Sequence, residues 1–137
     1  MPVITLTTEW RPDDFYSGIL KGRLCSLCPD TQVIDNAFNI PAFNITHASF
    51  VIRNTYMNYP AGSIHIICVH TDGGSDARYL LLRANDHYFI GADNGIFNLI
   101  LNQQPDEMVE IGDGEVSDEI GIFADAASFL VKGKSLR

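Results

Sequence analysis

The loop formed by residues 70–76 (His-Thr-Asp-Gly-Gly-Ser-Asp) combines an imidazole, two carboxylates, two hydroxyls and a pair of glycines. Glycines let the backbone approach a ligand closely, and N–H groups exposed in such a loop can bind an oxyanion or another polar ligand. The loop lacks the GxGxxG and GxxxxGKS/T spacings, so neither a dinucleotide site nor a P-loop is indicated. The alternative interpretation is a plain connection between strands that turns on Gly73-Gly74.

Two neighbouring carboxylates, Asp13 and Asp14, follow the first apolar segment. One interpretation is structural, because acidic side chains near the N-terminus of a helix cap and stabilise it. The other is functional: one carboxylate accepts hydrogen bonds from paired hydroxyls such as those of a ribose. The acidic residues between 106 and 119 lack the EF-hand spacing and are interpreted as a solvated surface.

Histidine and cysteine spacing does not favour a metal. The four histidines show no metal-ligand spacing, and His65, which alternates within a strand, is expected to be a hydrogen-bonded or surface residue. The C-S-L-C motif at 25–28 would suit a redox pair, but it falls at the end of a helical segment, before Pro29, where the helix dipole does not stabilise a thiolate. With Cys68, these cysteines are expected in an apolar structural setting.

An alternation of strands and helices must position these groups. Strands are predicted at 3–8, 31–35, 63–69, 79–83 and 87–90, the last two joined by a tight Asn85-Asp86 turn, with a solvated strand and loop at 105–119. Helices are predicted from Phe15 to before Pro29, after a Thr46 cap, at 95–101, and in a final amphipathic segment that stops at Gly133. This order predicts an α/β class, three-layered, with a mainly parallel twisted central sheet.

Polar residues follow several of the predicted strands directly. They are Glu9, Asp35-Asn36, the loop starting at His70, and Asp93-Asn94-Gly95. In open α/β sheets, ligands bind in the crevice outside the carboxyl ends of the strands. We therefore expect the functional site at this edge.

Composition excludes several classes of protein. The chain has 137 residues, enough for one domain, and a net charge of −8 with no basic patch, which disfavours a nucleic-acid partner. No apolar run approaches the roughly 20 residues needed to span a bilayer, so no membrane partner is expected. The N-terminus shows no signal-peptide pattern, so a cytoplasmic location is expected.

Several segments, taken in order, carry a family resemblance. They read I-T-L-T-T-E-W-R at 4–11, D-F-Y-S-G-I-L-K-G at 14–22, I-P-A-F at 40–43 and G-A-D-N-G at 91–95. Together they resemble the N-terminal domain of the S-adenosylmethionine hydroxide adenosyltransferase family, to which the fluorinase and chlorinase are related. The resemblance implies a fluorinase-like α/β domain and the hydrolysis of S-adenosylmethionine to adenosine and methionine.

The resemblance also implies a set of substrate-binding residues. The two acids that contact the ribose fall at Glu9 and Asp14, and the aromatic residue near the adenosine falls at Phe43. His70 stands where the family has an acid in the loop after the central strand. S-adenosylmethionine enters as substrate or ligand, and neither a cofactor nor a metal is implied.

The water-orienting residues of the family are all changed. They fall at His70, Ala77 and Asp118, so no catalytic residue is assigned. We therefore expect adenosyl or nucleoside binding with weak or lost hydrolysis. One alternative is an active hydrolase that depends on His70 within a longer chain; the other is a non-catalytic oligomerisation module.

The resemblance also implies a domain composition and an oligomeric state. Family members have a C-terminal β-rich domain and form trimers in which the substrate lies between subunits. This sequence ends at Arg137, where that second domain would begin. The expectation is a single N-terminal-type domain over 1–137, a homotrimer, and a small-molecule adenosyl ligand.

Overall fold

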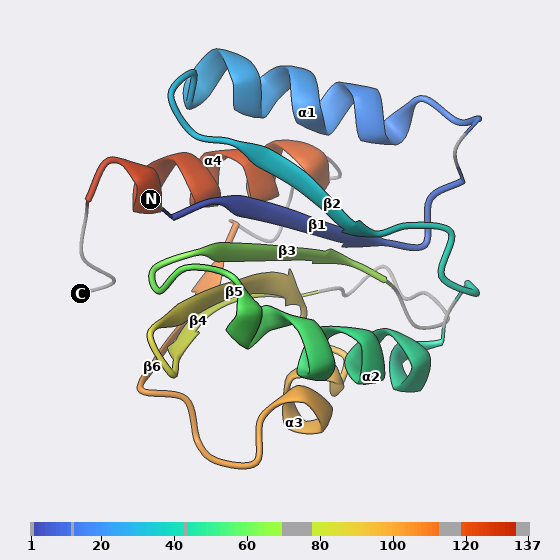
Figure 1. The fold of residues 1–137 in the computed structure, drawn as a ribbon, viewed down its shortest axis with the longest axis vertical. Coiled ribbons are helices and arrows are strands. Elements are labelled where there is room, and N and C mark those ends of the chain that lie inside the picture. The colour runs from blue at the N-terminus through green and yellow to red at the C-terminus, as the bar shows by residue number, and fades with distance from the viewer. Residues whose placement is uncertain (1, 12, 43, 70–77, 113–118, 134–137) are drawn as a thin grey trace.

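A computed structural model describes residues 2–11, 13–42, 44–69, 78–112 and 119–133. The strands are β1 (Ile4–Thr8), β2 (Val33–Ala37), β3 (Ile64–Cys68), β4 (Tyr79–Ala84), β5 (His87–Ala92) and β6 (Glu107–Ile111). The helices are α1 (Tyr16–Leu27), α2 (Ile45–Thr55) with a 3₁₀ turn η1 (Tyr56–Asn58), α3 (Ile96–Ile100) and α4 (Glu119–Val131). Helices α1 and α4 cover one face of the sheet, and α2 and α3 cover the other (Figure 1). The predicted three-layer α/β class is confirmed.

Within the described residues, one six-stranded sheet has the order β2-β1-β3-β5-β4-β6. Strands β1, β2, β3 and β5 are parallel, while β4 runs antiparallel to both β5 and β6. The mainly parallel sheet is therefore also confirmed. Because parallel strands end at the same edge, the residues that follow β1, β2, β3 and β5 gather there.

The core is divided between the two faces of the sheet, since successive side chains of a strand point to opposite faces. On the first face, Ile4 and Leu6 of β1 pack with the apolar sides of α1 and α4. The buried side chains of the second face include Ile52, Ile67, Leu82, Phe89 and Phe97. Each face has its own cluster, so β1 and β3 are covered on both sides.

Several element boundaries differ from the prediction, and those of β2 and α2 have a clear physical reason. Strand β2 begins at Val33, which pairs with Ile4, because Thr31 still belongs to the turn after α1 and donates its N–H to the carbonyl of Cys28 (3.1 Å). Helix α2 is capped by Asn44, whose side chain accepts from the N–H of His47 (2.9 Å), and not by Thr46. Thr46 already lies inside the first turn of this helix.

The predicted turn between β4 and β5 is confirmed. Asn85 and Asp86 have φ values of 53° and 62°, the left-handed conformation that a two-residue type I′ hairpin turn requires at both positions. Asn and Asp tolerate this region better than other residues with a Cβ.

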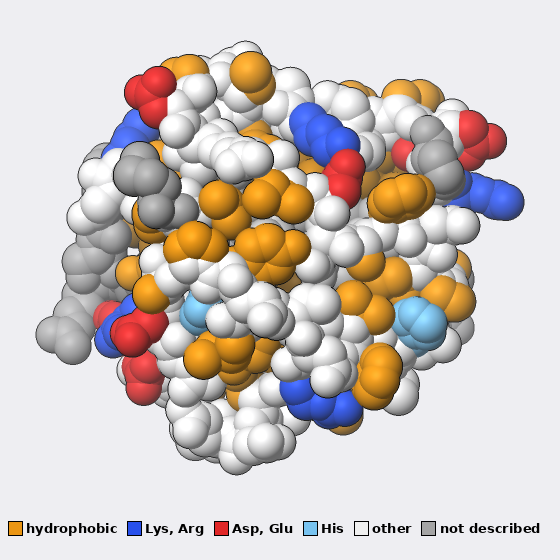
Figure 2. All heavy atoms as spheres, in the orientation of Figure 1, with side chains coloured by type: hydrophobic (Ala, Val, Ile, Leu, Met, Phe, Trp, Pro, Cys, Tyr) orange, Lys and Arg blue, Asp and Glu red, His pale blue; other side chains and the backbone are white. Residues whose placement is uncertain are grey.

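The surface is only partly polar. On the face drawn in Figure 2, hydrophobic side chains reach the surface in several places between isolated charged side chains. The most exposed large apolar side chains are Phe15, Phe50 and Met57. Within the described part of the chain, no helix is long and apolar enough to cross a bilayer.

Candidate functional site

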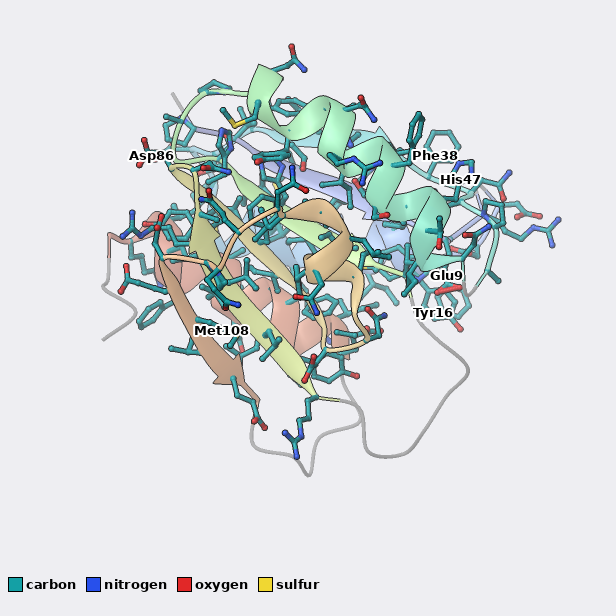
Figure 3. All side chains as sticks on the ribbon, turned by 90° about the horizontal axis from the view of Figure 1, so that it is seen from below. Glu9, Tyr16, Phe38, His47, Asp86 and Met108 are labelled. Atoms are coloured by element: carbon teal, nitrogen blue, oxygen red, sulfur yellow. The ribbon has the colours of Figure 1, made fainter. Side chains whose placement is uncertain are left out.

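Glu9 stands at the point where the two central strands end. The last residues of β1 and β3, Thr8 and Cys68, are register partners, and the N–H of Glu9 donates to the carbonyl of Cys68 (3.1 Å). The side chain is partly buried. Figure 3 shows Glu9 at the same end of the molecule as Tyr16, Phe38 and His47, with Asp86 at the opposite end. The structure thus places Glu9 at the carboxyl edge, where ligands bind in this class of fold.

This edge carries a second carboxylate that the sequence analysis assigned only to a solvated acidic segment. Glu119 is the first residue of α4. Burial raises the pKa of the fully buried Cys68 thiol, and the negative charges of Glu119 and Glu9 raise it further. Burial and Glu119 also raise the pKa of Tyr79. Both carboxylates therefore lie near enough to one buried thiol to raise its pKa.

The Asp14 side chain makes the hydrogen bonds that the structural interpretation of this residue predicts, at the start of a helix. Its Oδ2 accepts from the N–H of Arg11 (2.9 Å), and its Oδ1 accepts from the N–H of Tyr16 (3.2 Å), the first residue of α1. The carboxylate thus satisfies an N–H that the start of a helix leaves without an intrahelical partner. Each carboxylate oxygen keeps acceptor capacity for a ligand hydroxyl.

The remaining predicted site residues, Phe43, His70, Ala77 and Asp118, lie outside the described residues. The segment that follows β5 is described. The Asn94 side chain donates to the carbonyl of Val69 (3.0 Å) and accepts from the N–H of Ile96 (3.2 Å). Asn94 thus ties the end of β3 to the start of α3, while the neighbouring Asp93 is exposed.

His65 and His87 are buried far along the strands from this edge. Thr5 Oγ1 and His65 Nδ1 are 2.7 Å apart, and His65 Nε2 and His87 Nδ1 are 3.0 Å apart. Burial, together with the nearby His87, lowers the pKa of His65 to about 3. The expectation of a hydrogen-bonded residue is correct, and the surface alternative is wrong. Nowhere in the described ranges do three or more His, Cys, Asp or Glu side chains form a group that could hold a metal ion.

The cysteine motif lies at the C-terminal end of α1, as predicted. Cys28 is buried and burial raises its pKa, so this side chain is a neutral thiol at neutral pH. Cys25, however, is exposed, so the expectation of an apolar setting is wrong for this residue. The buried residues of α1 are Leu20 and Leu24.

Comparison with known proteins gives a consistent result. The protein-family model of the SAM hydroxide adenosyltransferase N-terminal domain matches residues 4–137 of this sequence. A protein of Methanocaldococcus jannaschii named (R)-S-adenosyl-L-methionine hydrolase is 29% identical over 105 residues, which is 73% of this chain and 40% of the relative. The protein of that name from Thermus thermophilus is 23% identical over 99 residues, 72% of this chain and 38% of the relative.

Solved structures share the fold. A conserved hypothetical protein from Thermus thermophilus superposes with a TM-score of 0.85 at 22% identity, covering 98% of this chain and 55% of that one. An uncharacterized conserved protein from Thermotoga maritima superposes with a TM-score of 0.87 at 23% identity, covering 98% of this chain and 56% of that one. The chain thus spans about 40% of the length of the curated relatives it matches. With the family model matched over nearly its whole length, the chain belongs to the S-adenosylmethionine hydroxide adenosyltransferase family, in the part that forms the N-terminal domain.

Proposed function

We propose that the chain binds the adenosyl group of S-adenosylmethionine at the carboxyl edge of β1 and β3, with weak or lost hydrolysis. The position of Glu9 carries this proposal: a partly buried carboxylate directly after β1, hydrogen-bonded through its backbone to the end of β3. A carboxylate has two oxygens that can accept from two neighbouring hydroxyls, which suits the 2′ and 3′ hydroxyls of a ribose. Asp14, Phe43 and His70 are proposed to complete the contacts.

The charge of the site supports a sulfonium ligand. Glu9 and Glu119 both act on Cys68, so two carboxylates lie at this edge, and S-adenosylmethionine carries a positive sulfonium. Adenosine lacks that charge and should bind more weakly. Because adenosine also lacks the methionine group, the affinity difference between the two ligands reports the charge and the methionine contacts together.

The expected reaction needs little covalent chemistry from the protein. A water oxygen attacks the ribose 5′ carbon, the carbon–sulfur bond breaks, and its electron pair stays on sulfur, which leaves as neutral methionine. The second product is adenosine, and one proton is released to solvent. Alignment of the water and its desolvation supply most of the acceleration. The groups that perform this task in the family are replaced at His70, Ala77 and Asp118, which supports weak or lost turnover.

The test separates binding from turnover. Calorimetric titration should show that S-adenosylmethionine binds and that Glu9→Gln weakens binding about 10- to 150-fold, since a charged hydrogen bond contributes about 1.5–3 kcal/mol. Glu110→Gln, at an exposed position of β6, is the matched control and should bind like the wild type. Release of adenosine should be slow or undetectable. Equal affinity in Glu9→Gln would refute the site, and efficient turnover would refute the loss of hydrolysis.

The greater length of the matched relatives favours a second candidate function. The matched hydrolases are more than twice as long as the matched segment. If this sequence belongs to a longer protein, an active hydrolase that uses His70 and a further domain becomes the alternative. A comparison of adenosine release by the 137-residue chain and by the longest natural product of its gene distinguishes the two.

Assembly as a homotrimer is part of the proposal. Light scattering coupled to size-exclusion chromatography should give three times the monomer mass. A monomer that still binds S-adenosylmethionine would remove the trimer from the proposal and leave the ligand site in place.

A further inference from the structure

Strand β6 forms one edge of the sheet, on the opposite side from β2. Among the described residues it pairs with β4 alone. An edge strand of this kind can add an extended peptide as a further strand, through main-chain hydrogen bonds. Four strand positions separate β6 from β1, roughly 19 Å at about 4.8 Å each, and Figure 3 shows Met108 of β6 well apart from Glu9. This edge is therefore distinct from the site proposed for the adenosyl group.

A hollow of about 400 Å³ lies beside β6, on the face of the sheet that α3 covers. Its apolar lining comes from Leu80, Leu82, Phe97, Leu101 and Met108. Met108 is 57% exposed, so the hollow presents an apolar surface right at the edge strand. Alternate side chains of a strand point to the same face, so an added strand directs every second side chain toward this hollow. The position next to Met108 therefore suits an apolar side chain.

The charges on β6 and around the hollow are mostly negative. Glu107 is paired with Arg83 of β4 at 2.9 Å, whereas Glu110, which lines the hollow, forms no ion pair with any residue that the structure describes. The described charged side chains of this region are Arg78, Arg83, Asp93, Asp106, Glu107 and Glu110. Four carboxylates thus stand against two guanidiniums, one of which already has a partner. This balance favours a basic occupant.

The same carboxylates disfavour a second copy of this chain as the occupant. Two β6 strands side by side would bring Glu107 and Glu110 of both copies into one pair of short strands. Like charges across neighbouring strands are destabilising, and charged side chains on an edge strand protect it against pairing with itself. The edge therefore selects a partner of opposite charge.

We propose that β6 binds an extended basic segment of another protein by strand addition. Main-chain groups of the segment pair with the outer side of β6. One apolar side chain lies on Met108 over the hollow, and a lysine or arginine two positions away pairs with Glu110, because Met108 and Glu110 lie on the same face of β6. This inference goes beyond the proposed function and does not require S-adenosylmethionine to bind at Glu9.

The experiment uses a fluorescein-labelled peptide, T-K-T-L-T-K-T, which places its lysines and leucine on one face in either strand direction. Fluorescence anisotropy should give a Kd below about 1 mM. The acidic peptide T-E-T-L-T-E-T should bind at least about tenfold more weakly, as should the basic peptide with all its backbone nitrogens methylated, which keeps the side chains but lacks the main-chain donors. Absence of binding by the basic peptide would overturn the proposal. Equal affinity of the acidic peptide would overturn the charge assignment, and equal affinity of the methylated peptide would overturn strand addition.

Variants locate the peptide. Glu110→Lys should weaken binding at least about fivefold, and Met108→Thr should weaken it less. Asp30→Lys, which makes the same change of charge at an exposed position after α1, should bind like the wild type. Circular dichroism verifies that each variant is folded.

Two further measurements separate this edge from other sites. Excess S-adenosylmethionine should leave the bound peptide in place; displacement, or loss of peptide binding in Glu9→Gln but not in Glu110→Lys, would assign the peptide to the carboxyl edge and overturn the inference. Light scattering should show that the peptide does not change the oligomeric state. Oligomers that dissociate when the peptide is added would assign the β6 edge to a second copy of the chain and also overturn it.

Discussion

The two faces of the sheet use the same strands but differ in their chemistry. Toward α1 and α4, β1 presents Ile4 and Leu6 to an almost wholly apolar cluster. Toward α2, it presents Thr5 and Thr7, which hydrogen-bond to His65 and Asn36. The alternation of side chains along a strand allows one short segment to contribute to both. The comparison shows that a buried strand can be apolar on one face and polar on the other.

The polar face is stable because its groups are paired. Asn36 donates to Thr7 and Thr55 and accepts from the hydroxyl of Tyr59, at 2.8–3.2 Å. No buried side-chain nitrogen or oxygen in the described residues lacks a hydrogen-bond partner. A buried polar group is costly only when it is unpaired, so this face tolerates hydroxyls and imidazoles.

The largest effect should come from a cavity on the apolar face. Phe123 of α4 is fully buried and packs edge-on against the ring of Tyr79 at 5.4 Å. Phe123→Ala should lower the free energy of unfolding by about 3–5 kcal/mol in urea titrations. Phe50→Ala, at a 60% exposed position of α2, should cost under about 1 kcal/mol. Similar losses in both variants would contradict the assignment of the core to this face.

Removal of one hydrogen-bond partner should have a smaller effect on the polar face. Thr5→Val keeps the shape of the side chain but leaves His65 Nδ1 without its partner, so a loss of about 1–3 kcal/mol is expected. Thr46→Val at an exposed position of α2 is the control, since Thr and Val have similar helix propensities. If Thr5→Val is as stable as the wild type, the pairing does not stabilise this face.

Acid should destabilise the protein through the histidines buried on the polar face. In the fold the pKa of His65 is about 3, and burial lowers the pKa of His87 against the raising effect of Asp86. Unfolded histidines titrate near 6.5, so below that pH the unfolded chain binds more protons and stability falls toward pH 3. The slope due to His65 should approach about 1.4 kcal/mol per pH unit.

The measurement is the free energy of unfolding at several pH values between 7 and 4 (roughly the range in which His titrates but most carboxylates do not). His65→Gln should flatten the slope relative to the wild type. His47→Gln, at an exposed position in the first turn of α2, should leave it unchanged. An unchanged slope in His65→Gln would show that another group controls the acid sensitivity.

The smallest effect should come from the exposed ion pair. Lys21 and Asp35 connect α1 to β2 at 2.6 Å, but exposed pairs contribute only about 0–1 kcal/mol. Asp35→Asn should therefore shift the urea midpoint little, and high salt should reduce the shift further. A loss of several kcal/mol would mean that this face depends on charge as well as on burial.

Much of the fold could be predicted from local patterns. The β-branched run at 4–8, Pro29 and the Asn85-Asp86 turn each fix an element through their own backbone preferences. The boundary of β2 could not be predicted, because pairing with β1 sets it. The His65–His87 pair also depends on register, since it joins positions 22 residues apart.

The site was predictable only as far as it depends on the ends of strands. The placement of Glu9 at the carboxyl edge follows from the end of β1, which the sequence marks clearly. The effect of Glu119 on that edge depends on how α4 packs on the sheet, which no short motif encodes. The Lys21–Asp35 ion pair likewise forms only when β2 lies beside α1.

The two-residue turn at Asn85-Asp86 has a consequence for the order of folding. It lets β4 and β5 pair with almost no loop to close, whereas Thr5 and His65 of β1 and β3 are 60 positions apart. Closing a longer loop costs more chain entropy, and distant pairings form more slowly. The hairpin should therefore be structured early in the folding transition state, with the β1–β3 pairing, and with it the carboxyl edge that holds Glu9, completed last.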